Sequence, residues 1–279
     1  MQSYVIAPAL TPVLMHFLAI EHPGSDSHLP ARVCPALTLT VRGNSSTAQA
    51  DGALLPHPRF MLSGATMSPR HVINEPGTLS IFVMFRPGAL QQALGLSAHE
   101  ITSRALDIHD VVGREHVDRF LHQLEEDRPI PEYIALLQDF LLSIFHPIDK
   151  QTIGTTLAAE YRKLFSPAID IAAEFNISER QLERKVRDAF GLPLRDMRRI
   201  VRFGLTLPKL LDPTVAWGDL TGIAQECGYF DQAHMHRDFT ELSGLAPTEL
   251  VRKIRSDDPA YWMYRIPQPD FNRLYIPVD

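Results

Sequence analysis

The sequence predicts an α+β fold with two main parts. Residues 1–150 are expected to form an antiparallel, β-rich and small barrel-like domain with a few helices. Residues 151–255 are expected to be all helical, with two helix-turn-helix subdomains joined by a linker helix. Three observations predict this division: β-forming runs early in the chain, helical periodicity with short breaks after residue 155, and a segment that occurs twice, at residues 169–193 and 221–247.

The two clearest strands lie in the first hundred residues. Residues 36–41 alternate apolar and hydroxyl side chains, which is the period of a half-buried strand. Residues 79–85 are a run of β-forming residues that ends at Arg86-Pro87-Gly88. Most of the 22 prolines lie in the N-terminal part or in the C-terminal tail, where they mark turns and strand edges. We therefore expect a compact antiparallel sheet or small barrel.

Three helices are expected to follow these strands. Residues 89–94 form a short helix stopped at Gly95, and two longer helices cover about residues 115–126 and 131–145. Pro131 suits a first helical turn, where its missing N–H needs no partner. The last helix has a broad apolar face. That face can dock on the sheet, which is the more common arrangement, or pair with a second copy of the chain.

The boundaries follow from changes in composition. Residues 149–153 separate the β-rich part from the helical part. Residues 256–279 form a tail with three aromatic residues close together, Tyr261, Trp262 and Tyr264. A tail so rich in aromatic residues is expected to pack along the surface of one domain.

Composition excludes several classes of protein. Apolar residues make up 45% of the chain and charged residues 22%, as in ordinary globular domains. No apolar run can span a bilayer, and the N-terminus lacks the pattern of a cleaved signal peptide. Cys34 and Cys227 lie far apart, and neither they nor the N-terminal histidines show metal-ligand spacing, so we expect no disulfide or metal site. These features agree with a cytoplasmic protein.

The net charge of −6 is unevenly distributed. Residues 1–150 carry 10 Lys and Arg against 15 Asp and Glu, whereas residues 151–255 carry 15 against 14. The basic residues of the second part are also clustered. Local clustering sets the electric field at a DNA backbone more than net charge does, so the acidic total does not exclude DNA as a partner.

The first copy of the repeat has the pattern of a helix, a sharp turn and a second, basic helix. Asn176 lies at the turn, and Ser178 can cap the second helix by accepting a backbone N–H. Helical periodicity places three side chains outward, where they are predicted to read base edges: Arg180, Glu183 and Arg184. Two more are predicted to contact phosphates: Lys185 and Arg187.

The second copy differs from the first in its outward residues. Gly228 lies at the turn, and Asp231 can cap the following helix. The predicted base readers of this helix are Gln232, His236 and Arg237. His234 is predicted to contact a phosphate or to stabilise the structure rather than to read bases. Two different reading faces on one chain predict an asymmetric DNA site.

A basic helix is expected between the two copies. Four arginines, three or four residues apart, form a stripe on one side of it: Arg195, Arg198, Arg199 and Arg202. Of these, Arg198 and Arg202 are predicted to contact phosphates. A helix of about 15 residues spans over ~20 Å, and recognition helices held in this way can enter successive major grooves about 34 Å apart. Pro208 is expected to end or kink the helix.

The same residues allow other interpretations. A single helix-turn-helix pattern is often only a pair of packed helices, and an arginine stripe is usually a solvated face, but two matching copies favour DNA binding. A DNA-repair protein that transfers an alkyl group needs a reactive cysteine, and Cys34 has only Arg32 nearby to lower its pKa. An N-terminal enzyme domain has no catalytic motif in its favour, so we expect no enzyme and assign no catalytic residue.

Residues 228–239, with Gly244-Leu245-Ala246-Pro247 after them, resemble the second helix-turn-helix of the AraC/XylS family of transcription regulators. Ser178, Leu182, Arg184 and Gly191 match the first. The resemblance covers about residues 155–252. It implies a seven-helix unit with two subdomains that binds promoter DNA and usually contacts RNA polymerase. Two residues depart from the family's pattern: Val186, where an aromatic residue is usual, and Pro208.

The resemblance extends weakly into the N-terminal part. Phe85-Arg86-Pro87-Gly88-Ala89, Gly95-Leu96 and Leu106-Asp107 resemble a poorly characterised domain that precedes such DNA-binding units. Family members often sense a small molecule in a β-barrel N-terminal domain, so the resemblance implies an effector-sensing or dimerising role for residues 1–150. It implies no cofactor. It leaves the effector, the sign of regulation and the choice between monomer and homodimer open.

Overall fold

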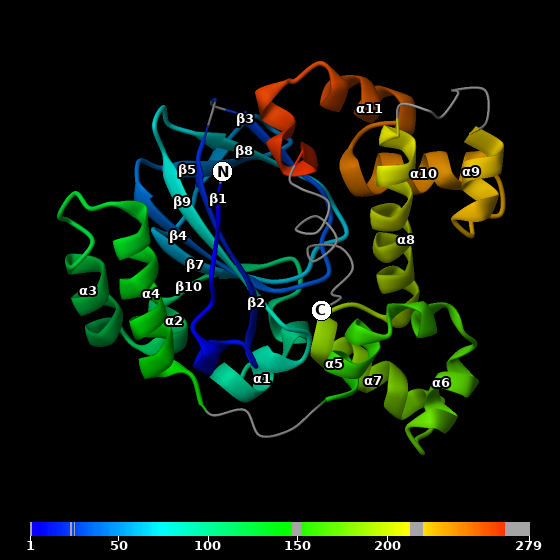
Figure 1. Cartoon of the computed structure of the whole chain (residues 1–279), viewed down its shortest axis with the longest axis horizontal. Coiled ribbons are helices and arrows are strands. Elements are labelled where there is room, and N and C mark those ends of the chain that lie inside the picture. The colour runs from blue at the N-terminus through cyan, green and yellow to red at the C-terminus, as the bar shows by residue number, and fades with distance from the viewer. Residues whose placement is uncertain (1, 23, 25, 147–151, 213–219, 266–279) are drawn as a thin grey trace.

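The protein has a two-sheet N-terminal part and a helical C-terminal part (Figure 1). This computed structural model describes residues 2–22, 24, 26–146, 152–212 and 220–265. The architecture confirms the predicted α+β fold. Within the described residues, no helix is both long and apolar enough to cross a membrane.

Two antiparallel sheets make up the N-terminal part. The larger has the strand order β1 (Gln2–Tyr4), β2 (Leu14–Glu21), β9 (Leu79–Phe85), β4 (Ala36–Arg42), β7 (Phe60–Ser63) and β10 (Ala105–Asp107). The smaller has the order β3 (Asp26–Leu29), β8 (Arg70–Asn74), β5 (Ser45–Ala48) and β6 (Leu54–Pro56). The two strands predicted most clearly, β4 and β9, lie side by side at the centre of the larger sheet.

The two faces of the larger sheet pack against different partners. Leu37 and Leu39 of β4 belong to the apolar core that this sheet forms with the N-terminal helices. Thr38 and Thr40, which point to the opposite face, are each only 6% exposed because the smaller sheet lies over them. The alternation in residues 36–41 thus marks a strand that is covered on both sides, where the sequence predicted a half-buried one.

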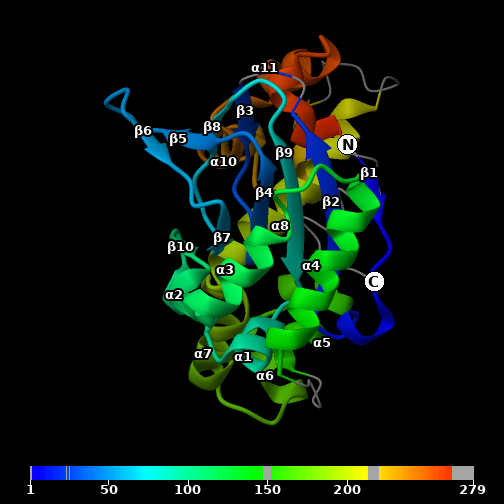
Figure 2. The ribbon, with the colours of Figure 1, turned by 90° about the vertical axis from the view of Figure 1, so that its left-hand side faces the viewer.

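Short helices cover the outer face of the larger sheet (Figure 2). They are η1 (Pro8–Leu10), α1 (Ala89–Leu94), η2 (Ala98–Ile101), α2 (His109–Val112), α3 (Arg114–His122) and α4 (Ile130–Ile144). Helix α3 ends four residues before the predicted end at residue 126. The apolar face of α4 docks on the sheet, with the Phe140 ring 5.8 Å from the Phe60 ring and 4.4 Å from the Phe120 ring. Docking is therefore the arrangement that this face adopts.

The C-terminal part is a succession of helices. They are α5 (Ile153–Ala159), η3 (Tyr161–Phe165), α6 (Ala168–Glu174), α7 (Glu179–Phe190), α8 (Leu194–Leu211), α9 (Leu220–Glu226), α10 (Gln232–Ser243), α11 (Pro247–Arg255) and η5 (Pro259–Arg265). In Figure 1, α8 runs between a lower group, α5 to α7, and an upper group, α9 to α11. Each group holds one copy of the repeat, and α8 is the predicted linker helix.

Pro208 was expected to end or kink the linker helix, and it does not end it. Helix α8 continues through Pro208 to Leu211. The proline removes one backbone donor, but it lies within the last turns of the helix, where few hydrogen bonds depend on it. Leu207 and Leu210 on either side are fully buried, and their packing favours the helical path over a break.

The start of the C-terminal tail bridges the two parts of the protein. The Trp262 Nε1–H donates to Ser27 Oγ on β3 at 2.9 Å, and the Tyr261 ring stacks on His28 at 4.8 Å. Element η5 also contacts α11. The aromatic cluster therefore packs against both domains, where the sequence predicted one. Residues 266–279, and most of the predicted boundary at residues 149–153, lie outside the described residues.

Candidate DNA interface

The first recognition helix, α7, is capped as its sequence predicts. Ser178 Oγ accepts the backbone N–H of Gln181 at 3.2 Å, and Gln181 Oε1 accepts the N–H of Ser178 at 2.9 Å. Asn176 at the preceding turn has a φ of 52°. Gly191, with a φ of 80°, ends the helix in the left-handed conformation that glycine adopts most easily. These local interactions fix where α7 begins and ends.

The second recognition helix, α10, repeats this geometry with different residues. Asp231 Oδ1 accepts the backbone N–H of His234 at 2.6 Å. Gly228 at the turn has a φ of 77°, and Gly244 ends the helix with a φ of 81°. The buried side chains beneath the two helices also correspond: Leu182 and Val186 under α7, Met235 and Phe239 under α10. The sequence repeat is therefore a structural repeat.

Most of the predicted base readers are exposed. Arg180 and Arg184 on α7 lie on the surface, as do Gln232, His236 and Arg237 on α10. Glu183 is the exception, because it is half-buried and its Oε1 lies 3.6 Å from a guanidinium nitrogen of Arg187. The structure thus groups the predicted residues by helix, three on each.

Two of the predicted phosphate contacts on the linker helix bind protein groups. Arg198 donates through Nε to the Leu164 carbonyl and through a terminal nitrogen to the Ser166 carbonyl, the second bond being 2.6 Å long. Burial, followed by the nearby positive charge of Arg202, lowers the pKa of Arg198. The Arg202 guanidinium lies 5.1 Å from the centre of the Tyr229 ring. These contacts hold α8 to the two repeats, and the phosphate roles stay predictions.

The other predicted phosphate contacts lie in different surroundings. Lys185 is exposed and lines a groove between α7 and α1, together with Gln91 and Gln92. The His234 ring meets the Tyr229 ring edge-on at 5.3 Å. His234 therefore has the structural contacts that the sequence allowed as one of its two roles.

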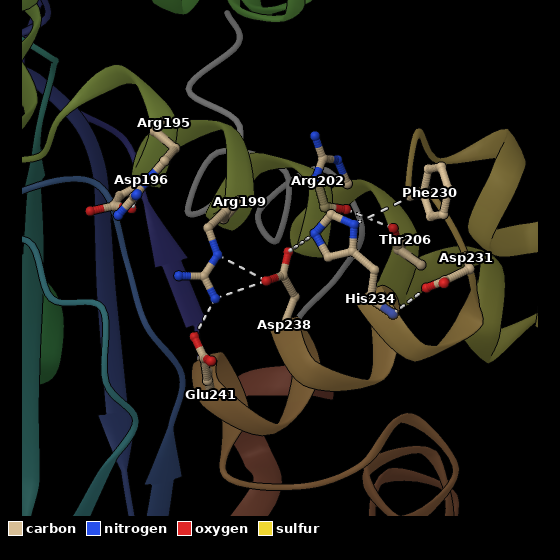
Figure 3. Close-up of polar contacts among 10 residues, drawn as sticks. All are labelled: Arg195, Asp196, Arg199, Arg202, Thr206, Phe230, Asp231, His234, Asp238 and Glu241. Atoms are coloured by element: carbon tan, nitrogen blue, oxygen red, sulfur yellow. Dashed lines mark hydrogen bonds and ion pairs between the residues drawn. The ribbon is translucent and has the colours of Figure 1, made fainter.

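A polar cluster around the buried carboxylate of Asp238 joins the linker helix to α10 (Figure 3). Arg199 donates through Nε to Asp238 Oδ1 at 2.8 Å and through a terminal nitrogen to Glu241. Burial by itself lowers the pKa of Arg199, but the hydrogen bonds with Glu241 and Asp238 outweigh it, so the pKa is raised. Neither Arg199 nor Asp238 was predicted to have a role in binding. One sequence signal for this contact was available: Asp238 is a charged residue at an inward position of its helix, and Arg199 lies 39 residues before it in the chain.

Both recognition helices end against the N-terminal domain. At the end of α7, Thr102 Oγ1 donates to the Gly191 carbonyl at 2.6 Å and the Gly88 N–H donates to the Ala189 carbonyl at 3.1 Å. At the end of α10, the Ala31 N–H donates to the Leu242 carbonyl at 2.8 Å. The last carbonyls of a helix have no partner within it, so donors from another domain satisfy them here.

The cysteines do not have the surroundings of reactive thiols. Cys34 is fully buried, and burial raises the pKa of its thiol to about 12, with the opposing effect of Arg32 being smaller. Cys227 is half-buried beside the helical core. Alkyl transfer requires a thiolate, so the buried Cys34 is unsuited to it.

A comparison with protein families identifies part of the C-terminal region. Residues 171–253 match a family model described as a helix-turn-helix domain, whereas no curated protein matches the chain. A structure of ToxT from Vibrio cholerae aligns with 85% of this chain and 98% of its own, with 8% identity and a TM-score of 0.47. ToxT bound to (E)-4-(8-methylnaphthalen-1-yl)but-3-enoic acid aligns over the same shares, with 10% identity and a TM-score of 0.46.

A second similar structure is the AraC-like transcriptional activator CuxR. It aligns with 66% of this chain and 71% of its own, with 15% identity and a TM-score of 0.23. The assignment of this chain rests on the helix-turn-helix match, which includes both recognition helices. Residues 171–253, with their two capped and exposed recognition helices, therefore form a DNA-binding helix-turn-helix domain of a transcription regulator.

Proposed function

We propose that one chain of this regulator binds an asymmetric DNA site, with α7 and α10 in successive major grooves on one face of the duplex. The observation that carries the proposal is that α8 joins the two repeats as one uninterrupted helix of 18 residues. Such a helix is about 27 Å long. Near its start, Arg198 binds the Ser166 carbonyl before α6, and Arg199 binds Asp238 on α10. A rigid linker of this length supports the proposal, because successive major grooves on one face of B-DNA lie about 34 Å apart.

The outward residues divide into base readers and phosphate contacts. The proposed readers are Arg180, Glu183 and Arg184 in the first groove and Gln232, His236 and Arg237 in the second. Arginine pairs with guanine through two bonds, glutamine pairs with adenine, and glutamate accepts from cytosine. The surface exposure of five of these six residues supports their proposed role. For the sixth, Glu183, the carboxylate has to separate from Arg187 before it can read a base.

Phosphate contacts are proposed for Lys185, Arg187, Arg198, Arg202 and His234. Lys185 is the most exposed of these. Three of these residues also contact protein groups in the structure: Arg198, Arg202 and His234. The phosphate contacts proposed for them are secondary to this packing. Such contacts set the register of the protein on DNA without reading its sequence.

We further propose that residues 1–150 form a regulatory domain that senses an effector or joins two chains. Residues 151–255 then form the DNA-binding domain, and residues 256–279 form the C-terminal tail, whose described start contacts both domains. The bonds from Thr102 to Gly191 and from Ala31 to Leu242 support this, because they link the first domain to both recognition helices. At a promoter, RNA polymerase is the expected protein partner. No catalytic step is proposed.

Selection of bound duplexes from a random pool, using the full chain, tests the DNA-binding proposal. One asymmetric site with two conserved segments about one helical turn apart is the expected result. Two direct or inverted copies of that site would indicate a dimer on DNA. Absence of any enriched sequence, at a salt concentration where nonspecific binding persists, would contradict the proposal. The double variant Arg180→Ala, Arg237→Ala is the control for enrichment through the two recognition helices.

A further inference from the structure

The turns of the two helix-turn-helix repeats correspond residue by residue up to one point. In the first repeat the Ile177 N–H donates to the Ala172 carbonyl at 3.0 Å, and in the second the Tyr229 N–H donates to the Ala224 carbonyl at 2.9 Å. Both bonds close the turn after the first helix of their repeat, and both side chains pack against the same helical core. Ile177 and Tyr229 therefore occupy equivalent positions.

The second repeat then has one extra residue before its recognition helix. Ser178 follows Ile177 directly and caps α7. The corresponding cap of α10 is Asp231, and Phe230 lies between it and Tyr229. Each cap accepts the backbone N–H three residues further along. The first repeat forms its turn and its cap without an extra residue, so the fold of the unit does not require Phe230.

The extra residue is a large apolar side chain that faces solvent. Phe230 is 86% exposed, whereas the preceding residue, Tyr229, is buried and lies beside the Arg202 guanidinium. A single exposed apolar residue is common on protein surfaces and by itself indicates no function. Phe230 differs in its location, because it lies where the turn enters the second recognition helix (Figure 3).

The position of Phe230 is continuous with the proposed DNA interface. Its N–H donates to Nδ1 of His234 at 3.5 Å, so it lies against the first turn of α10. Gln232, a proposed base reader, is the first residue of that helix. The N-terminal residues of a recognition helix are the ones that contact base edges. With α10 in the major groove, the exposed ring therefore lies beside the bases.

The chemistry of the ring selects one group in the groove. A phenyl ring has no N–H or O–H to donate, and most groups on the base edges are hydrogen-bond donors or acceptors. The exception is the C5-methyl group of thymine, which projects into the major groove and makes apolar contacts. Contact between this methyl group and the ring removes apolar surface of both from water, which is favourable.

We propose that Phe230 contacts the C5-methyl group of a thymine beside the base pair that Gln232 reads. The inference rests on the proposed function, in which α10 enters the major groove, and it adds a specificity-determining residue to that interface. The equivalent place in the first repeat has no extra residue. The thymine contact is therefore a property of the second repeat, and it contributes to the asymmetry of the DNA site.

Replacing the thymines of the selected site with deoxyuridine, one at a time, tests the proposal, because each replacement removes only a methyl group. Binding of the full chain is measured by titration. At one position the replacement is expected to weaken binding of the wild type about three- to tenfold. Phe230→Ala should bind the unmodified site more weakly by about the same factor, and the replacement at that position should not weaken its binding further.

Two further variants accompany this comparison. Phe230→Leu keeps an apolar side chain and should retain part of the affinity and part of the response to the methyl group. Leu55→Ala is the matched control, because Leu55 is an exposed apolar residue on β6, far in the chain from both recognition helices. It should bind and respond as the wild type does. Because the Phe230 ring is exposed, Phe230→Ala is expected to unfold at the same urea concentration as the wild type.

Three results would overturn the proposal: no replacement weakens binding of the wild type, Phe230→Ala binds the unmodified site as tightly as the wild type, or every replacement weakens both proteins equally. Any of these, obtained with a selected site, contradicts this inference alone, since the site itself supports the proposed function. A random pool that yields no enriched sequence contradicts the proposed function, and the thymine contact fails with it.

Discussion

The Nε–H of Arg199 on the linker helix donates to Oδ1 of Asp238 on the second recognition helix at 2.8 Å (Figure 3). Asp238 is 2% exposed, and its Oδ2 lies 3.8 Å from the Nε2 of His234. A carboxylate buried to this degree depends on the guanidinium beside it for its charge to be stable. The contact therefore fixes α10 on α8, and with it the position of the second reading face.

Loss of the Arg199 guanidinium should destabilise the C-terminal domain. We expect Arg199→Met to lower the free energy of unfolding by about 2–3 kcal/mol, because Asp238 is left buried without its partner. Arg195→Met on the same helix is the control. The Arg195 side chain is 85% exposed, and its loss should change stability by no more than about 0.5 kcal/mol. Urea denaturation of both variants checks this, and equal stabilities would contradict the role of the Arg199–Asp238 contact.

Arg237 should contribute sequence preference as well as affinity. Arg237→Ala is expected to weaken binding to the selected site by about 1–3 kcal/mol and to relax the preference at one base pair. Arg252→Ala, on α11, removes another exposed charge that lies on neither recognition helix, and it should preserve the preference. Titrations against the selected site and its single-base variants make the comparison. If Arg237→Ala discriminates among them as well as the wild type, then Arg237 reads no base.

The two glycines that end the recognition helices should respond differently to substitution. Both have a positive φ, so an added side chain costs about 1–2 kcal/mol at either position. A Cβ at Gly191 would also lie 2.8 Å from the Ala98 carbonyl oxygen, whereas at Gly244 the nearest atom belongs to Pro69, at 3.5 Å. Gly191→Ala should therefore lower the midpoint of thermal unfolding more than Gly244→Ala does. The reverse order would show that the end of α7 is not closely packed on the N-terminal domain.

Stability should fall as the pH decreases from 6.5 to 4. Burial lowers the pKa of His22 and His57 to about 4 in the folded protein, against about 6.5 in an unfolded chain. The unfolded state then binds more protons in this window, so stability present above pH 6.5 is lost as the pH falls towards 4. Each shift corresponds to about 3 kcal/mol. Denaturation at pH 7 and pH 5 measures the effect.

A histidine variant separates this effect from general acid denaturation. His57→Gln removes one of the two groups and should reduce the loss of stability between pH 7 and pH 5. His99→Gln, at an exposed position, should leave the loss unchanged. An identical pH dependence in wild type and His57→Gln would mean that His57 is not buried as a neutral ring.

The recognition helices could be predicted from the sequence because their boundaries depend on local interactions. Ser178 and Asp231 cap helices through bonds to residues three positions away, and Asn176 and Gly228 adopt the backbone angles that the turn requires. The outward residues followed from helical periodicity in the same way. The pattern could not indicate that Arg198 and Arg199 bind protein groups, because their partners lie 32 to 42 residues away in the chain.

The sequence by itself determined the α+β division, the central strands β4 and β9, and the differing outward residues of α7 and α10, because periodicity and caps act within a few residues. Only the tertiary structure decided which element packs against each face of a strand or helix. Thr38 and Thr40 lie on the polar side of an alternating pattern, and such a side is expected to face solvent. In the structure a second sheet packs over that side, so both threonines line a cavity together with Arg70. These contacts join residues that are far apart in the chain, so no short-range sequence pattern predicts them.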